Sequence, residues 1–145
     1  MMGPVVSARL FFDMALFSML GLGLETCFTA ASEWPSKRDR HLLGFSSLWY
    51  IPLYALAPPA FRFLGPQVFG LHWALRGVLY TLAIYLVEYF GMLALRGLLG
   101  SSPSEEGYRK SRWNVRGLIR LDFAPAWFAA GLFFERVWLA LHPLS

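Results

Sequence analysis

Three acidic residues, Glu25, Glu88 and Asp122, lie inside long apolar stretches of the chain. A charged side chain at the centre of a membrane helix costs roughly 2.5–3.5 kcal/mol or more, so an acid in such a place invites a functional explanation. Carboxylates buried close together repel one another when ionised, which leaves at least one of them with a proton available for exchange. These residues therefore favour proton-coupled transport or acid and base chemistry, and three carboxylates could also hold a hard divalent cation.

The composition indicates which elements position these acids. Hydrophobic residues make up 57% of the 145 residues and charged residues 15%, against roughly 45–50% and about 25% in ordinary soluble proteins. Lipid is therefore the expected solvent for much of the surface, and the length allows about four spans of roughly 20 residues. The sequence predicts an all-α fold, a single transmembrane domain over residues 1–145 built as a bundle of four transmembrane helices, at about residues 10–31, 46–64, 71–95 and 118–141.

Prolines should interrupt two of these helices. Pro52, Pro58 and Pro59 lie in the second span, and Pro125 lies near the start of the fourth. Because proline lacks a backbone donor, we expect the second span to kink or to end early and the fourth to kink.

The three acids should lie at one depth in the membrane. At a rise of 1.5 Å per residue, Glu25, Glu88 and Asp122 lie about 9, 11 and 6 Å from span ends that face the same side. Small and polar residues recur at helical spacing around them, a pattern that packs helices closely in lipid. These faces predict a polar cleft, lined on the first span by Ser18, Gly21, Glu25, Thr29 and Ser32, on the third by Gly77, Thr81, Glu88 and Gly91, and on the fourth by Asp122, Ala126 and Ala129.

Basic residues predict the orientation. Thirteen Lys and Arg against nine Asp and Glu give a formal charge of +4. Most of the basic residues fall in the first and third loops or beside them: Lys37, Arg38, Arg40, Arg96, Arg109, Lys110, Arg112, Arg116 and Arg120. The positive-inside rule therefore places these two loops in the cytoplasm and both termini outside it. We expect a multi-pass protein of the bacterial inner membrane or an equivalent membrane, whose basic loops meet lipid phosphates rather than nucleic acid.

Other charged residues are expected to have structural roles. Asp13 follows Arg9 by four residues, so the two should pair on one helix. Arg76 and Arg96, near the ends of the third span, should reach the lipid headgroups, and Glu135 should lie at the membrane interface.

Metal and cofactor signals are weak. The three histidines are scattered and Cys27 is the sole cysteine, so no metal-ligand spacing arises and no metal site is predicted. The sequence also has no phosphate-binding loop and no nucleophile motif, and no cofactor is expected.

Four stretches carry a family resemblance. They are Gly23–Ala30 (GLETCFTA), the set Ser47, Leu48, Trp49 and Tyr54, then Leu75–Glu88 (LRGVLYTLAIYLVE) and Arg112–Phe128 (RWNVRGLIRLDFAPAWF). The chain resembles the transmembrane protein 229 family, whose bacterial members bear the label of type IV ABC-transporter permease. The resemblance implies a small multi-span membrane protein with motif positions at Glu25, Glu88, Trp113, Asn114 and Asp122. This chain departs from the family pattern, with Asn114 and Val115 where an Asp-Tyr pair is usual and Asp122 where Glu is frequent.

The leading functional hypothesis is a small transporter or permease-like component for a cationic or proton-coupled solute. Glu25 and Glu88 would bind the cation or proton, and Asp122 would assist. The remaining candidate binding residues are Asn114, Trp113, Trp49 and Arg120. One alternative is a membrane enzyme acting on a lipid or isoprenoid headgroup, and another is a scaffold or assembly factor whose acids join helices. Membrane lipids are the expected partners, and a homodimer or a partner membrane subunit is compatible with the sequence.

Overall fold

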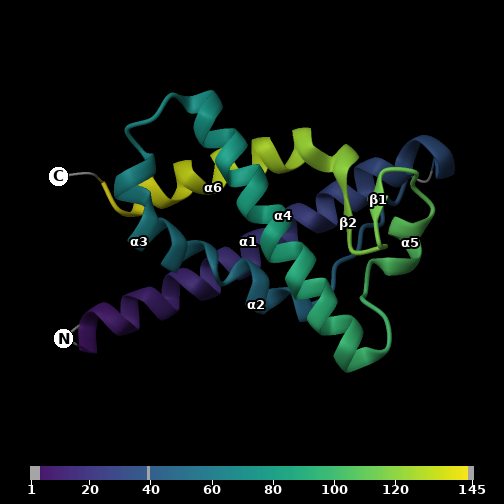
Figure 1. Cartoon of the computed structure of the whole chain (residues 1–145), viewed down its shortest axis with the longest axis horizontal. Coiled ribbons are helices and arrows are strands. Elements are labelled where there is room, and N and C mark those ends of the chain that lie inside the picture. The colour runs from purple at the N-terminus through teal and green to yellow at the C-terminus, as the bar shows by residue number, and fades with distance from the viewer. Residues whose placement is uncertain (1–3, 39, 144–145) are drawn as a thin grey trace. The chain divides into compact units, whose positions relative to one another are not determined.

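The fold is mostly helical, as the sequence predicts. The computed structural model describes residues 4–38 and 40–143 (Figure 1). The helices are α1 (Pro4–Lys37), α2 (Ile51–Tyr54), α3 (Ala57–Val68), α4 (Trp73–Leu99), α5 (Glu105–Arg109) and α6 (Ala124–Leu141), with 3-10 turns η1 (Leu48–Tyr50) and η2 (Leu121–Phe123). A small antiparallel hairpin, β1 (Asn114–Val115) and β2 (Ile119–Arg120), was not predicted.

The chain divides into two compact units, Met1–Pro59 and Ala60–Ser145, with the boundary inside α3. The first unit contains α1 with η1 and α2. The second contains most of α3 together with α4, α5, the hairpin and α6. The contacts described below are internal to one unit or the other.

Two helices are long and apolar enough to cross a membrane. They are Ala8–Glu33 within α1, with 26 residues, and α4, with 27 residues. Both exceed the roughly 20 residues that a bilayer requires. They correspond to the first and third predicted spans.

The second and fourth predicted spans contain irregular backbone. Residues 46–64 are divided among η1, α2 and α3, with Pro52 near the start of α2. At the fourth, residues 118–123 form part of the hairpin and η2, and the helix begins only at Ala124. Pro125 therefore occupies the first turn of α6, where its missing N–H removes no hydrogen bond, and the expected kink is replaced by a helix start.

In the second unit, α4 and α6 approach closely at two glycines. A methyl group added at Gly77 would lie 2.3 Å from the Phe128 ring, and one at Gly131 would lie 2.5 Å from Tyr80 Cβ. The Phe61 ring of α3 contacts both Tyr80 and Trp138, with ring centroids 5.6 and 6.0 Å apart. Small residues thus set the spacing of α4 and α6, and aromatic rings fill the space beside them.

Candidate functional site

The first unit holds Glu25 in the middle of its long helix. Glu25 Oε2 accepts hydrogen bonds from Ser46 Oγ at 2.9 Å and from the Tyr54 hydroxyl at 3.2 Å. Both donors belong to the segment that follows α1 and returns along it. The carboxylate therefore joins residues far apart in the sequence.

The rest of the polar stripe on α1 supports the same segment. Ser18 Oγ donates to the carbonyl oxygen of Ile51 at 3.1 Å. Thr29 Oγ1 accepts from the backbone N–H of Phe45 at 2.8 Å and donates to its carbonyl oxygen at 3.0 Å. At Gly21, an added Cβ would lie 2.2 Å from the Tyr54 ring. These positions of the stripe therefore contact residues 45–54, whereas the predicted cleft among three spans stays a prediction.

Glu25 differs from the acids that pair with arginine in the chemistry of its partners. Its two donors are neutral hydroxyl groups. Among the side chains that the structure describes, no Lys or Arg forms an ion pair with it, whereas Arg side chains pair with four other acids: Asp13, Glu105, Asp122 and Glu135. When Glu25 is ionised, its negative charge is therefore not neutralised by any basic side chain that the structure describes.

Glu88 lies near the middle of α4 in the second unit and is 7% exposed. Its Oε1 accepts a hydrogen bond of 2.8 Å from the hydroxyl of Tyr108, which belongs to α5. The Tyr108 ring meets the Phe123 ring edge-on, at a centroid distance of 5.8 Å. Like Glu25, this acid accepts a hydroxyl hydrogen bond from a segment outside its own helix.

Asp122 is held by an arginine. Arg120 Nη2 and Nε donate to its two carboxylate oxygens at 2.6 and 3.1 Å. The same guanidinium lies 4.1 Å from the centroid of the Phe123 ring. These hydrogen bonds are the largest cause of a pKa of Asp122 below its ordinary value, so this side chain is an ionised, paired carboxylate. Arg120 thus occupies the position that a cationic ligand of Asp122 would take.

Tyr85 relates the two acids of the second unit to each other. Its hydroxyl donates to the carbonyl oxygens of Arg120 and Leu121 at 2.9 and 3.1 Å. Tyr85 therefore joins α4, which carries Glu88, to the segment that carries Asp122. Glu25 belongs to the first unit.

The remaining candidate residues have local roles. Asn114 Oδ1 accepts from the N–H of Gly117 at 2.8 Å and its amide nitrogen donates to the Ser111 carbonyl at 2.5 Å, which closes the turn between β1 and β2. Trp113 is 50% exposed, with the Arg112 guanidinium 5.4 Å from its ring centroid. Trp49 is likewise 50% exposed. Asn114 shapes the hairpin, and the two tryptophans present their rings outward.

One acid that the sequence analysis placed at the membrane interface is a buried contact between helices. Glu135 of α6 is 1% exposed. It accepts from Arg76 Nε at 2.9 and 3.2 Å and from the Tyr80 hydroxyl, both on α4. Arg76 also donates to the carbonyl oxygens of Phe69 and Leu71. Glu135 and Arg76 therefore neutralise each other within the protein, a pairing that was not predicted.

A second ion-pair cluster ties α5 to the end of α4. Glu105 accepts from Arg96 Nη2 at 2.9 Å, from Arg109 Nη2 at 2.5 Å and from the backbone N–H of Ser102 at 3.0 Å. The Ser102 bond first, and then the two arginines, lower the pKa of Glu105 to about 2. Arg96 therefore binds a carboxylate of the connection after α4, a contact that was not predicted.

The predicted pair at the start of α1 is present. Arg9 Nε lies 3.4 Å from Asp13 Oδ1, four residues further along the helix, and Asp13 is almost completely buried. In the part of the chain that the structure describes, no three His, Cys, Asp or Glu side chains are grouped in a way that could hold a metal ion.

No model of a known protein family matches the chain, and no solved structure matches it.

Proposed function

We propose that the protein is a multi-pass integral membrane protein that transports a cationic or proton-coupled solute, with Glu25 and Glu88 as the groups that bind the proton or cation. The observation that carries the proposal is the environment of Glu25. Within a 26-residue apolar segment, its carboxylate is held by two neutral hydroxyl groups and, among the described side chains, by no basic one. A carboxylate held in this way can gain and lose a proton or a cation without breaking an ion pair.

The surface of α4 supports a location in lipid. Large apolar side chains that recur every three or four residues along this helix are exposed: Leu75, Leu79, Leu82, Leu86 and Phe90. Such exposure is unfavourable in water and favourable in a bilayer. On α1, Phe11, Phe12 and Met19 are exposed as well.

The proposal makes α6 a further membrane-spanning helix, and the pairing of its buried acid, Glu135, with an arginine supports this. The helix has 18 residues and is therefore about 27 Å long, close to the thickness of the hydrocarbon core. Glu135, which would be costly in lipid, is paired with Arg76. A fourth pass would consist of η1, α2 and α3, whose irregular backbone needs partners within the protein. We place both termini outside the cytoplasm, because most basic residues lie in the segments after α1 and between α4 and α6.

The proposal gives Asp122 a lesser role than Glu25 and Glu88. Its charge is already compensated by Arg120. We assign this pair to positioning the segment before α6, and we assign exchange of the proton or cation to the two acids that accept hydroxyl hydrogen bonds.

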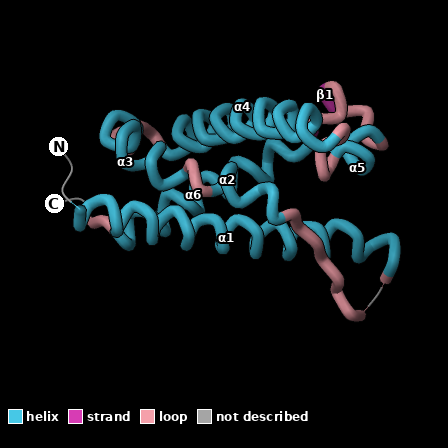
Figure 2. Tube along the Cα trace, turned by 90° about the horizontal axis from the view of Figure 1, so that it is seen from below, coloured by secondary structure: helices cyan, strands magenta, loops and turns pink. Residues whose placement is uncertain are grey.

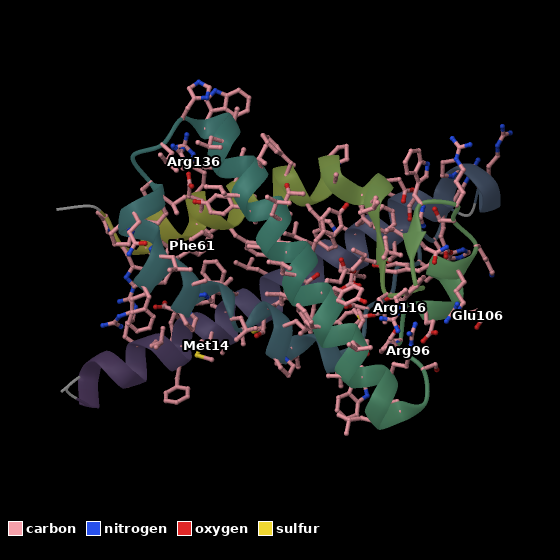
Figure 3. The ribbon with its side chains drawn as sticks, viewed as in Figure 1. Met14, Phe61, Arg96, Glu106, Arg116 and Arg136 are labelled. Atoms are coloured by element: carbon pink, nitrogen blue, oxygen red, sulfur yellow. The ribbon has the colours of Figure 1, made fainter. Side chains whose placement is uncertain are left out.

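The test is a flux assay in proteoliposomes. A pH-sensitive dye inside the vesicles reports proton movement driven by a potassium diffusion potential, and ethidium serves as the probe for organic cations. Wild-type protein should carry proton flux, ethidium flux or both, and Glu25→Gln and Glu88→Gln should abolish it. The matched control is Glu106→Gln, which removes the same charge from an exposed position of α5 and should leave flux unchanged (Figure 3). Flux that is the same in all four proteins, or no flux of either probe above that of empty vesicles, would contradict the proposal.

A further inference from the structure

The connection after α4 folds back along the helix that it leaves. Gly100 ends α4 with φ +86, a left-handed conformation that reverses the chain. Tyr108 then bonds to Glu88, which lies eleven residues and about 16 Å before the Leu99 end of α4. Figure 2 shows α5 and β1 gathered at one end of α4. Tyr108 of the short helix α5 therefore reaches back to the middle of α4.

Glu105 fastens this connection at its base. Its Oε1 accepts from both Arg96 and Arg109, and its Oε2 accepts from Arg96 Nε and the N–H of Ser102. Arg96 also donates to the carbonyl oxygen of Arg116, so one side chain at the end of α4 holds α5 and the hairpin together (Figure 3).

Tyr108 forms the part of the connection that reaches Glu88. Its hydroxyl bonds to the carboxylate at 2.8 Å, and its ring packs edge-on against Phe123, just before α6. The tyrosine thus contacts α4 on one side and the start of α6 on the other. Glu88, at 7% exposure, is covered in this arrangement.

We propose that α5 is a lid over Glu88, in which Tyr108 is the positioning residue and the contact between Glu105 and Arg96 is the latch. The lid controls the access of a proton or cation to Glu88. It rests on the proposed function only in this respect, because that function assigns the binding of the proton or cation to Glu88. The lid opens when the Tyr108 hydroxyl leaves Glu88 and the Tyr108 ring leaves Phe123. The latch between Glu105 and Arg96 sets how often this occurs.

Reaction with dicyclohexylcarbodiimide tests the lid without any transport assay. This apolar reagent adds to a protonated carboxylic acid: the carboxyl oxygen bonds to the central carbon of the carbodiimide, and the acid proton moves to one of its nitrogens. Mass spectrometry of the full-length protein in detergent gives the labelled fraction at Glu88, with Glu135, a buried acid of the same unit, as an internal reference. Unfolding of the second unit would expose both acids, so the ratio of Glu88 to Glu135 reports the lid and not general instability.

Two variants and one control decide the result. Arg96→Gln removes the latch and leaves the Tyr108 hydroxyl in place, whereas Tyr108→Ala removes the cover itself. Each should raise the labelling ratio by about fivefold, the change that corresponds to loss of one typical hydrogen bond. Arg112→Gln, which removes an exposed charge that stacks on Trp113, should leave the ratio unchanged. A ratio that is the same in Arg96→Gln, Tyr108→Ala and the wild type would overturn the lid, whatever the flux assay shows.

Discussion

Arg76 Nε lies 2.9 Å from Glu135 Oε2, and this ion pair joins α4 to α6. The pair is buried, with side-chain exposures of 16% for Arg76 and 2% for Glu135. Tyr80 adds a hydrogen bond to the same carboxylate. Glu135 thus has a cationic partner inside the protein, whereas the side-chain donors to Glu25 in the described part of the chain are both hydroxyl groups.

Removing one member of this pair should destabilise the second unit. Glu135→Ala leaves the guanidinium of Arg76 without its anion, and such a loss in a buried pair costs about 3–5 kcal/mol. The double variant Arg76→Met with Glu135→Leu removes both charges and should recover most of that stability. Denaturant or thermal unfolding in detergent measures both. Equal losses in the single and double variants would show that the charge pairing is unimportant.

Substitution of Glu25 should separate function from stability. Glu25→Gln keeps an oxygen that can accept from Ser46 and Tyr54, so the free energy of unfolding should change by no more than about 1 kcal/mol. Flux should nevertheless be lost, because an amide cannot exchange a proton. A Glu25→Gln protein that loses flux only in proportion to its loss of folded protein would instead make Glu25 a structural residue.

The closing of α5 should depend on pH only in the acid range. The pKa of Glu105 is lowered from 4.5 to about 2, so the stability it contributes is fully present above pH 4.5 and is lost as the pH falls through about 2. Hydrogen exchange of residues 101–113 should therefore accelerate between pH 4.5 and 2, after correction for the intrinsic exchange rate. Glu105→Gln should exchange rapidly at neutral pH and lose this acid-dependent step. If the step persists in that variant, another group is responsible for it.

Close approach of α4 and α6 can be tested with two glycines. Gly131→Ala places a methyl group 2.5 Å from Tyr80 Cβ, an overpacked contact that should cost about 1–3 kcal/mol. Gly97→Ala in α4 has no neighbouring atom within 4 Å, and alanine favours a helix by about 1 kcal/mol over glycine, so this variant should be unchanged or more stable. Melting temperatures of the two variants provide the comparison. Equal values would mean that the helices separate easily at Gly131.

The sequence predicted the parts of the structure that depend on periodicity. Ser18, Gly21, Glu25 and Thr29 recur at helical spacing, and they form the face of α1 that residues 45–54 contact. The helical nature of α1 and α4 followed from their long apolar runs.

Periodicity could not identify which charges meet. Glu135 and Arg76 are 59 residues apart, and the match between them depends on the packing of α4 against α6. The apolar residues of the hairpin continue into those of α6, so the hydrophobic pattern alone predicts one longer helix there. The turn did carry a signal, since Asn114 precedes Gly117 by three residues and Gly117 adopts φ +70.

The central claim is that the carboxylate of Glu25 exchanges a proton or a cation, and infrared difference spectroscopy tests it most directly. Spectra of the wild type are recorded across pH and with ethidium added, and spectra of Glu25→Gln are subtracted. The account predicts a carboxyl C=O band that appears with acid or a carboxylate band that changes with ethidium, absent in the variant and shifted by Tyr54→Phe. A carboxylate signal of Glu25 that responds to neither pH nor ethidium would contradict the account.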